Sequence, residues 1–146
     1  MEASEKERLY LQAALLELKE YLLSPVLYWP ITITSTTRED RTTLPKLTPG
    51  CLYLSMEKCL VFDFPTGKKI EVAERIKKVT ALIDERRTAW RMKAEKELQA
   101  RIRQWATYLN DIKRNKGINQ ATYSYQVRDR VILQLLGDKL GLGGAI

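Results

Sequence analysis

A stretch of 49 residues from Lys68 to Lys116 contains neither proline nor glycine. These two residues most often end a helix, and good helix formers fill the stretch. The sequence therefore predicts a single helix from about residue 73 to residue 115, roughly 60–65 Å long. An alternative starts this helix at Lys68. A helix of this length exceeds the usual globular range and is typical of an element that projects from its domain or joins an assembly.

The same stretch carries the basic excess of the chain. It holds 15 Lys or Arg and 7 Asp or Glu, whereas the whole chain has a formal net charge of +7. Charge concentrated in this way favours a polyanionic or acidic partner, and phosphates bind Lys and Arg without sequence readout. We expect sequence-tolerant nucleic-acid binding by an accessory subunit. On an ideal wheel Lys78, Lys96, Arg103 and Arg114 align opposite the apolar residues, and Lys77, Lys113 and Lys116 are the other candidates.

Ion pairing within the helix is a competing interpretation of these charges. Pairs spaced (i, i+4) each contribute a few tenths of a kcal/mol, about 0.2–0.5, if the segment is helical. The five pairs use four acids and leave a surplus of cations, which an acidic protein partner would also explain. The five pairs are Glu71–Arg75, Glu74–Lys78, Arg91–Glu95, Lys93–Glu97 and Glu97–Arg101.

Apolar residues of the long helix form a seam whose spacing drifts from 3.5 towards 4 residues. This drift argues against a regular two-stranded coiled coil and favours packing on shorter helices or on a partner. Tryptophans in such a seam are usually core or interface anchors. We therefore predict an interface at Trp90, Leu98, Trp105 and Leu109. Arg101, beside the seam, extends to solvent, pairs with a buried carboxylate or reaches across an interface.

The rest of the chain predicts an α+β fold that is mainly helical, in a single domain spanning residues 1–146. A strong turn signal, Pro65-Thr66-Gly67-Lys68, separates short apolar runs that resemble a small antiparallel meander. Ser24-Pro25 ends a first helix, and Gly137 ends a last one. The expected elements are helix 5–23, strands at about 26–34, 51–55, 59–64 and 69–72, a loop at 35–50, helix 122–136 and a flexible tail at 137–146.

The absence of histidine excludes Ser-His-Asp and Cys-His nucleophile systems and His-ligated metals. Cys51 and Cys59 have a C-x7-C spacing that is not usual for zinc, and no Walker or Rossmann glycine pattern occurs. We therefore expect no enzyme activity, metal or cofactor. No apolar run is long enough for a membrane span, and no signal peptide is visible, so we expect a cytoplasmic protein without a membrane partner.

The second function consistent with the sequence is a structural or adaptor subunit. Its helices would mediate protein–protein contacts in a phage-like or other multi-subunit particle, with a homo-oligomer as one possibility. The overlong helix and a first helix with apolar residues on two faces favour this alternative. It is compatible with nucleic-acid binding, because the two would use different sides of the same helix.

Overall fold

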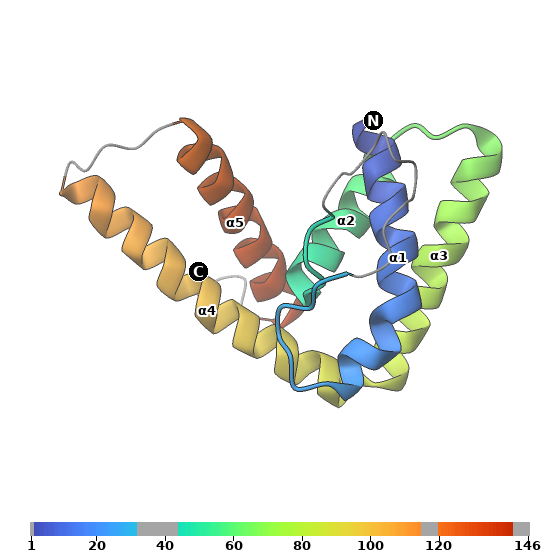
Figure 1. Cartoon of the computed structure of the whole chain (residues 1–146), viewed down its shortest axis with the longest axis horizontal. Helices are drawn as coiled ribbons and strands as arrows, with labels where there is room; N and C mark the ends of the chain where they lie inside the picture. The colour runs from blue at the N-terminus through green and yellow to red at the C-terminus, as the bar shows by residue number, and fades with distance from the viewer. Residues whose placement is uncertain (1, 32–43, 115–119, 142–146) are drawn as a thin grey trace.

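The computed structural model describes residues 2–31, 44–114 and 120–141, with the side chains of 120–123 excepted. Within these residues all the regular structure is helical (Figure 1). The predicted α+β fold with a β-meander is therefore wrong. The helices are α1 (Ala3–Leu23), α2 (Pro49–Val61), α3 (Thr66–Glu85), α4 (Arg87–Lys113) and α5 (Gln120–Lys139).

The helices form a body and an arm. The body consists of α1, α2 and α3, and α1 packs against both of the others. From the lower end of this body α4 runs outward, and α5 returns from the far end of α4 towards α2 (Figure 1). We call α4 and α5 together the α4–α5 arm, because their distal ends diverge well away from α1, α2 and α3 (Figure 1).

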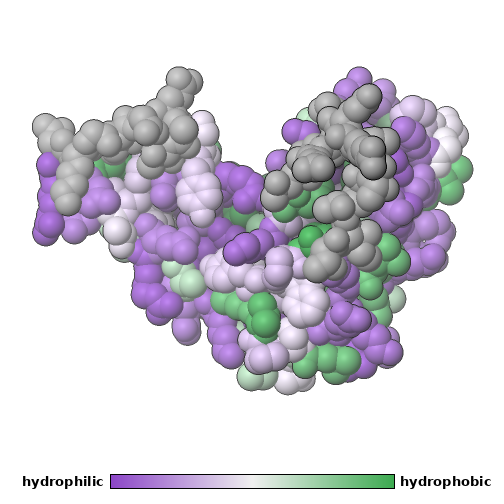
Figure 2. All heavy atoms as spheres, in the orientation of Figure 1, coloured by the Kyte–Doolittle hydropathy of each residue, from purple (hydrophilic) through white to green (hydrophobic). Residues whose placement is uncertain are grey.

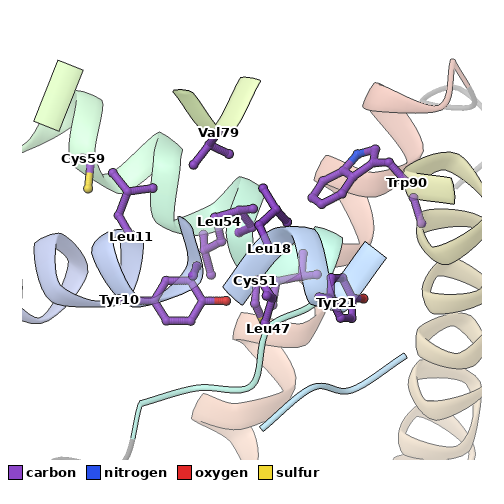
Figure 3. Packing of buried hydrophobic residues seen from close by; sticks show 14 of the residues in the cluster. Tyr10, Leu11, Leu18, Tyr21, Leu47, Cys51, Leu54, Cys59, Val79 and Trp90 are labelled. Carbon is purple, nitrogen blue, oxygen red and sulfur yellow. The ribbon is translucent and has the colours of Figure 1, made fainter. Parts of the chain in front are cut away.

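The core lies where the inner faces of α1, α2, α3 and the proximal part of α4 meet, and residues from the base of α5 join it (Figure 3). Leu11 and Leu18 of α1 are fully buried, and full burial of one leucine contributes about 1.5–3 kcal/mol. The two buried tyrosines of α1 keep their hydroxyls hydrogen-bonded. Tyr10 donates to the Lys46 carbonyl at 3.1 Å, and Tyr21 donates to the Leu27 carbonyl at 2.8 Å. These bonds fix the segment that precedes α2, which contains Lys46, and the segment that follows α1, which contains Leu27.

The predicted strands at 51–55 and 59–64 fall mainly within α2, so these assignments are wrong. The helix begins with a local start signal that the prediction overlooked. Thr48 is the N-cap, and its Oγ1 accepts the Cys51 N–H at 3.0 Å, while Pro49 occupies the first turn. Within these apolar runs, Cys51, Ser55 and Cys59 are four residues apart and lie on one buried face of the helix.

The predicted strand at 69–72 is also wrong, because those residues lie in α3, which begins at Thr66. The alternative start at Lys68 is closer to the structure. The single helix 73–115 is wrong as well, since the chain turns at Arg86 (φ −122°, ψ 45°) and splits it into α3 and α4. Val79 before the turn and Trp90 after it belong to the same core cluster (Figure 3).

The two terminal helices are confirmed, with α1 covering the predicted helix 5–23 and α5 extending the predicted helix 122–136 at both ends. The predicted strand 26–34 is reduced, within its described part, to one isolated bridge between Trp29 and Leu47. Of the predicted loop 35–50, residues 35–43 lie outside the described residues. Of the predicted tail, residues 137–139 are helical and 142–146 lie outside the described residues.

Candidate binding cleft on the α4–α5 arm

A buried ionic cluster fixes α4 against α5. Arg101 of α4 is 5% exposed and forms ion pairs with Glu97, one turn earlier, and with Asp129 of α5. Burial by itself lowers the pKa of Arg101, but the charge of Glu97 and the hydrogen bonds of both carboxylates outweigh it, so the pKa is raised. The guanidinium therefore stays charged inside the fold. Of the three expectations for Arg101, pairing with buried carboxylates is the one the structure shows.

The same cluster holds the N-terminus of α2. Glu97 is fully buried, and its Oε1 accepts the Gly50 backbone N–H at 2.6 Å. Its Oε2 accepts the Thr48 hydroxyl at 2.6 Å and the Arg101 Nε at 2.8 Å. A carboxylate at this position is stabilised by the free N–H groups and dipole of the helix start. Three helices are thus joined at one point, which is the base of the arm.

Beyond this base, α4 and α5 enclose an open cleft of about 500 Å³. Its lining combines an arginine, amides, hydroxyls and two tyrosines, whereas aliphatic side chains are few. Tyr108 of α4 is buried, and Tyr125 of α5 is 58% exposed. The face of the arm shown in Figure 2 is likewise mainly hydrophilic. The cleft is lined by Ala100, Arg103, Gln104, Thr107, Tyr108, Asp111, Tyr125 and Gln126.

Three of the predicted cations lie along one line of α4, and Arg103 among them lines the cleft. Lys96 lies on the other side of the base, in a hollow beside the end of α1. Lys96, Arg103 and Arg114 are spaced by 7 and 11 residues, close to about two and three helical turns. All three are exposed, and none of them forms an ion pair with another described residue. Lys113, in the last turn of α4, is also exposed and without an ion pair among the described residues.

The other predicted cations are not part of this row. Lys77 and Lys78 are exposed but lie on α3, behind the turn at Arg86, so the predicted alignment of Lys78 with the α4 cations does not exist. Lys116 lies outside the described residues. Of the five predicted ion pairs, Glu71–Arg75, Arg91–Glu95 and Glu97–Arg101 are present.

The predicted interface residues separate into two groups. Trp90 and Leu98 belong to the core, where Trp90 donates its Nε1–H to the Tyr53 hydroxyl at 2.7 Å. Trp105 is half-buried and contacts Tyr108 with ring centroids 5.4 Å apart. Leu109 is 44% exposed. Only the distal pair is therefore available to another molecule.

Tyr108, Tyr125 and Gln126 were not predicted as site residues. Their place in the cleft depends on how α5 docks on α4, and a helical pattern in each segment does not contain that information. The one useful signal was Tyr125 itself, an aromatic residue outside the apolar stripe of its own helix, and therefore a candidate for exposure.

A metal site and a membrane-spanning helix are both absent from the described residues. These contain no group of three or more His, Cys, Asp or Glu side chains arranged to hold a metal ion. None of their helices has both the length and the apolar content that a bilayer-spanning segment requires. Comparison with known protein families, curated proteins and solved structures finds no match to this chain.

Proposed function

We propose that the chain is a non-enzymatic accessory subunit that binds single-stranded nucleic acid in the cleft of the α4–α5 arm, without sequence preference. The observation that carries the proposal is the row on α4 formed by Lys96, Arg103 and Arg114, of which Arg103 lines the cleft. These cations lack carboxylate partners among the described residues, so binding a phosphate backbone costs no existing ion pair.

The length of the row suits a run of consecutive phosphates. From Lys96 to Arg114 the helix rises about 27 Å, so one strand can contact the three cations in succession. Such contacts orient a strand but do not distinguish its bases. The arm carries few competing charges on this side, with Asp111 the one carboxylate among the cleft residues.

Tyr125 supports a single strand rather than a duplex. More than half of its side chain is exposed in a cleft that also contains amides and hydroxyls. Exposed aromatic rings stack on unpaired bases, at about 1–3 kcal/mol per base, and accept any base because every base has a π-face. The bases of a duplex are already stacked, so a duplex would use only the cations.

The proposal differs from the sequence-based one in its physical basis. An unbroken basic rod is not present, and the cations of α3 are separated from those of α4 by the turn at Arg86. What remains is a shorter row next to a cleft. As part of the same proposal the chain works with other protein subunits in a reducing, cytoplasmic compartment, where its two free thiols, Cys51 and Cys59, stay reduced.

The test is fluorescence anisotropy with labelled mixed-sequence and oligo-dT strands of about 20 nucleotides, titrated at several salt concentrations. Three phosphate contacts predict a slope of log K against log salt of about −2. The double variant Lys96→Gln/Arg103→Gln should flatten this slope by about 1.4 and weaken binding at low salt. Replacement of Tyr125 by Ala should weaken single-strand binding without changing the slope.

The matched control is Lys77→Gln/Lys78→Gln, which removes the same charge from an exposed part of α3. It should leave the slope unchanged. If both double variants weaken binding equally, the effect is net charge and no site exists on the arm. Absence of any binding at about 20 mM salt, where screening is weak, would overturn the proposal.

A further inference from the structure

Four apolar residues follow one another along the distal half of α4 at spacings of 3, 4 and 3 residues. They are Ile102, Trp105, Leu109 and Ile112, and we call them the distal seam. Ile102 is 43% exposed, Leu109 44% and Ile112 42%, while Trp105 is half-buried. The residue preceding them in the same register, Leu98, is buried in the core. The seam is therefore the continuation of a core-facing stripe beyond the region that the body covers.

Among the described residues, the seam touches the core cluster through Trp105, while its other three side chains are exposed. In Figure 1 the distal half of α4 extends past α1, α2 and α3, and α5 diverges from it. The proposed nucleic-acid site does not use the seam either. At about 100° per residue, the seam lies roughly 150° around α4 from the line through Lys96, Arg103 and Arg114.

The 3-4-3 spacing is that of the a and d positions of a coiled coil, over about two heptads. A helix with the same apolar repeat fits such a seam through i, i+3, i+4 and i+7 anchors. We infer that the distal seam docks an amphipathic helix of a protein partner, and that the flanks of this partner helix are acidic. The inference stands independently of nucleic-acid binding.

The acidic character of the partner follows from the charges on α4. From Leu98 to Arg114 the helix carries four cations, of which Arg101 is buried in ion pairs and Arg103 and Arg114 lie on the line opposite the seam. The one carboxylate in this range, Asp111, lines the cleft on the other side. The flank of the seam therefore offers Lys113, exposed and without an ion pair among the described residues, and no carboxylate. A second copy of α4 would bring like charges together, whereas an acidic helix supplies the missing anions.

The test uses two synthetic helical peptides of about three heptads, with Leu at a and d. One has Glu at e and g, and its twin has Lys there. Titration into the full chain is followed by calorimetry and by the tryptophan fluorescence of Trp105. The acidic peptide should bind at least about tenfold more tightly than the basic twin. The variant Ile102→Gln/Leu109→Gln should weaken acidic-peptide binding by about tenfold or more.

Three controls make the outcome decisive. Leu16→Gln/Leu60→Gln alters two residues that are 62% and 70% exposed on other helices, and it should bind the acidic peptide as the native chain does. An acidic peptide of the same composition in scrambled order should not bind. Lys96→Gln/Arg103→Gln should keep peptide binding while losing nucleic-acid binding, which separates the two proposals.

Two results would overturn the inference. One is equal affinity for the acidic, basic and scrambled peptides, or equal binding by the native chain and Ile102→Gln/Leu109→Gln. The other is a homodimer in sedimentation that this double variant dissociates, because the occupant of the seam would then be a second copy of the chain.

Discussion

Glu97 of α4 accepts the backbone N–H of Gly50, the second residue of α2, at 2.6 Å. A side chain from one helix thus closes the start of another, at the point where Arg101 also joins α4 to α5. The cleft lies directly beyond this junction on the same pair of helices. The junction therefore joins the start of α2 to α4 and α5, and it lies at the base of the two helices that would bind a ligand.

Replacing Gly50 by Ala should destabilise the protein strongly. A Cβ at this position would lie 2.3 Å from Ile132 Cγ2 and 2.9 Å from Glu97 Oε2. Ile132 is fully buried and branched at Cβ, so it cannot move aside easily. We expect a loss of about 2–4 kcal/mol in the free energy of unfolding, measured by urea denaturation.

Gly67→Ala is the matched control for this prediction. Gly67 lies in the first turn of α3, and nothing is within 4 Å of the Cβ that the substitution would add. Alanine favours helix over glycine, so this variant should be equally stable or up to about 1 kcal/mol more stable. Equal losses in the two variants would contradict the close packing around Gly50.

Substitution of Arg101 by Leu should cost about 3–5 kcal/mol, because it leaves Glu97 and Asp129 buried without a cation. The triple variant Arg101→Leu/Asp129→Leu/Glu97→Gln should restore part of this loss, since no uncompensated charge remains and Gln keeps an acceptor for the Gly50 N–H. The measurement is a set of urea curves for the single and triple variants. Additive losses, with the triple variant the least stable, would show that the three groups do not form one coupled unit.

Some parts of the fold follow from local sequence signals and could be predicted, whereas others depend on tertiary packing. Thr48 followed by Pro49 is a local signal for the start of α2. The same pair is also typical of the end of a loop, and the sequence analysis places it in the predicted loop 35–50. The turn at Arg86 has no such local signal. It goes with tertiary packing, because α3 packs against α1 on one side of the turn and α4 packs against α5 on the other.

The candidate site shows the same division. Charge composition pointed to the cations of α4, and the exposed positions of Lys96, Arg103 and Arg114 agree with that expectation. The aromatic and amide residues of the cleft depend on the docking of α5, which a single sequence does not reveal. Arg101 shows the limit most directly, since the same spacing to Glu97 describes either a surface pair or a buried one.

Lys93 should prove structurally important although it belongs to the basic segment. Its amine donates to the carbonyls of Ser24 and Val26, just after the end of α1, and lies 4.2 Å from the centre of the Tyr21 ring. Lys93→Met leaves these carbonyls without their donor, so we expect a loss of about 1–3 kcal/mol in thermal or urea unfolding. Lys96→Met, at an exposed position one turn later, should change stability by less than about 0.5 kcal/mol.

Cys59 should make the stability of the protein fall at alkaline pH. Burial, and then the charge of Glu7, raises the pKa of its thiol from an ordinary value of 9.0 to about 11. Between these two values the unfolded chain releases the proton while the folded chain keeps it, so stability decreases as pH rises, by at most about 1.4 kcal/mol per pH unit. Below pH 9 the contribution is complete.

Buried tyrosines add to the alkaline loss, so the comparison must be made with Cys59→Ala, which retains them. The stability difference between the native chain and this variant should be constant from about pH 6 to 8 and should shrink as the pH approaches 11. Urea curves at a series of pH values measure it, and a difference that stays constant or grows would mean that the thiol is not buried in the folded protein.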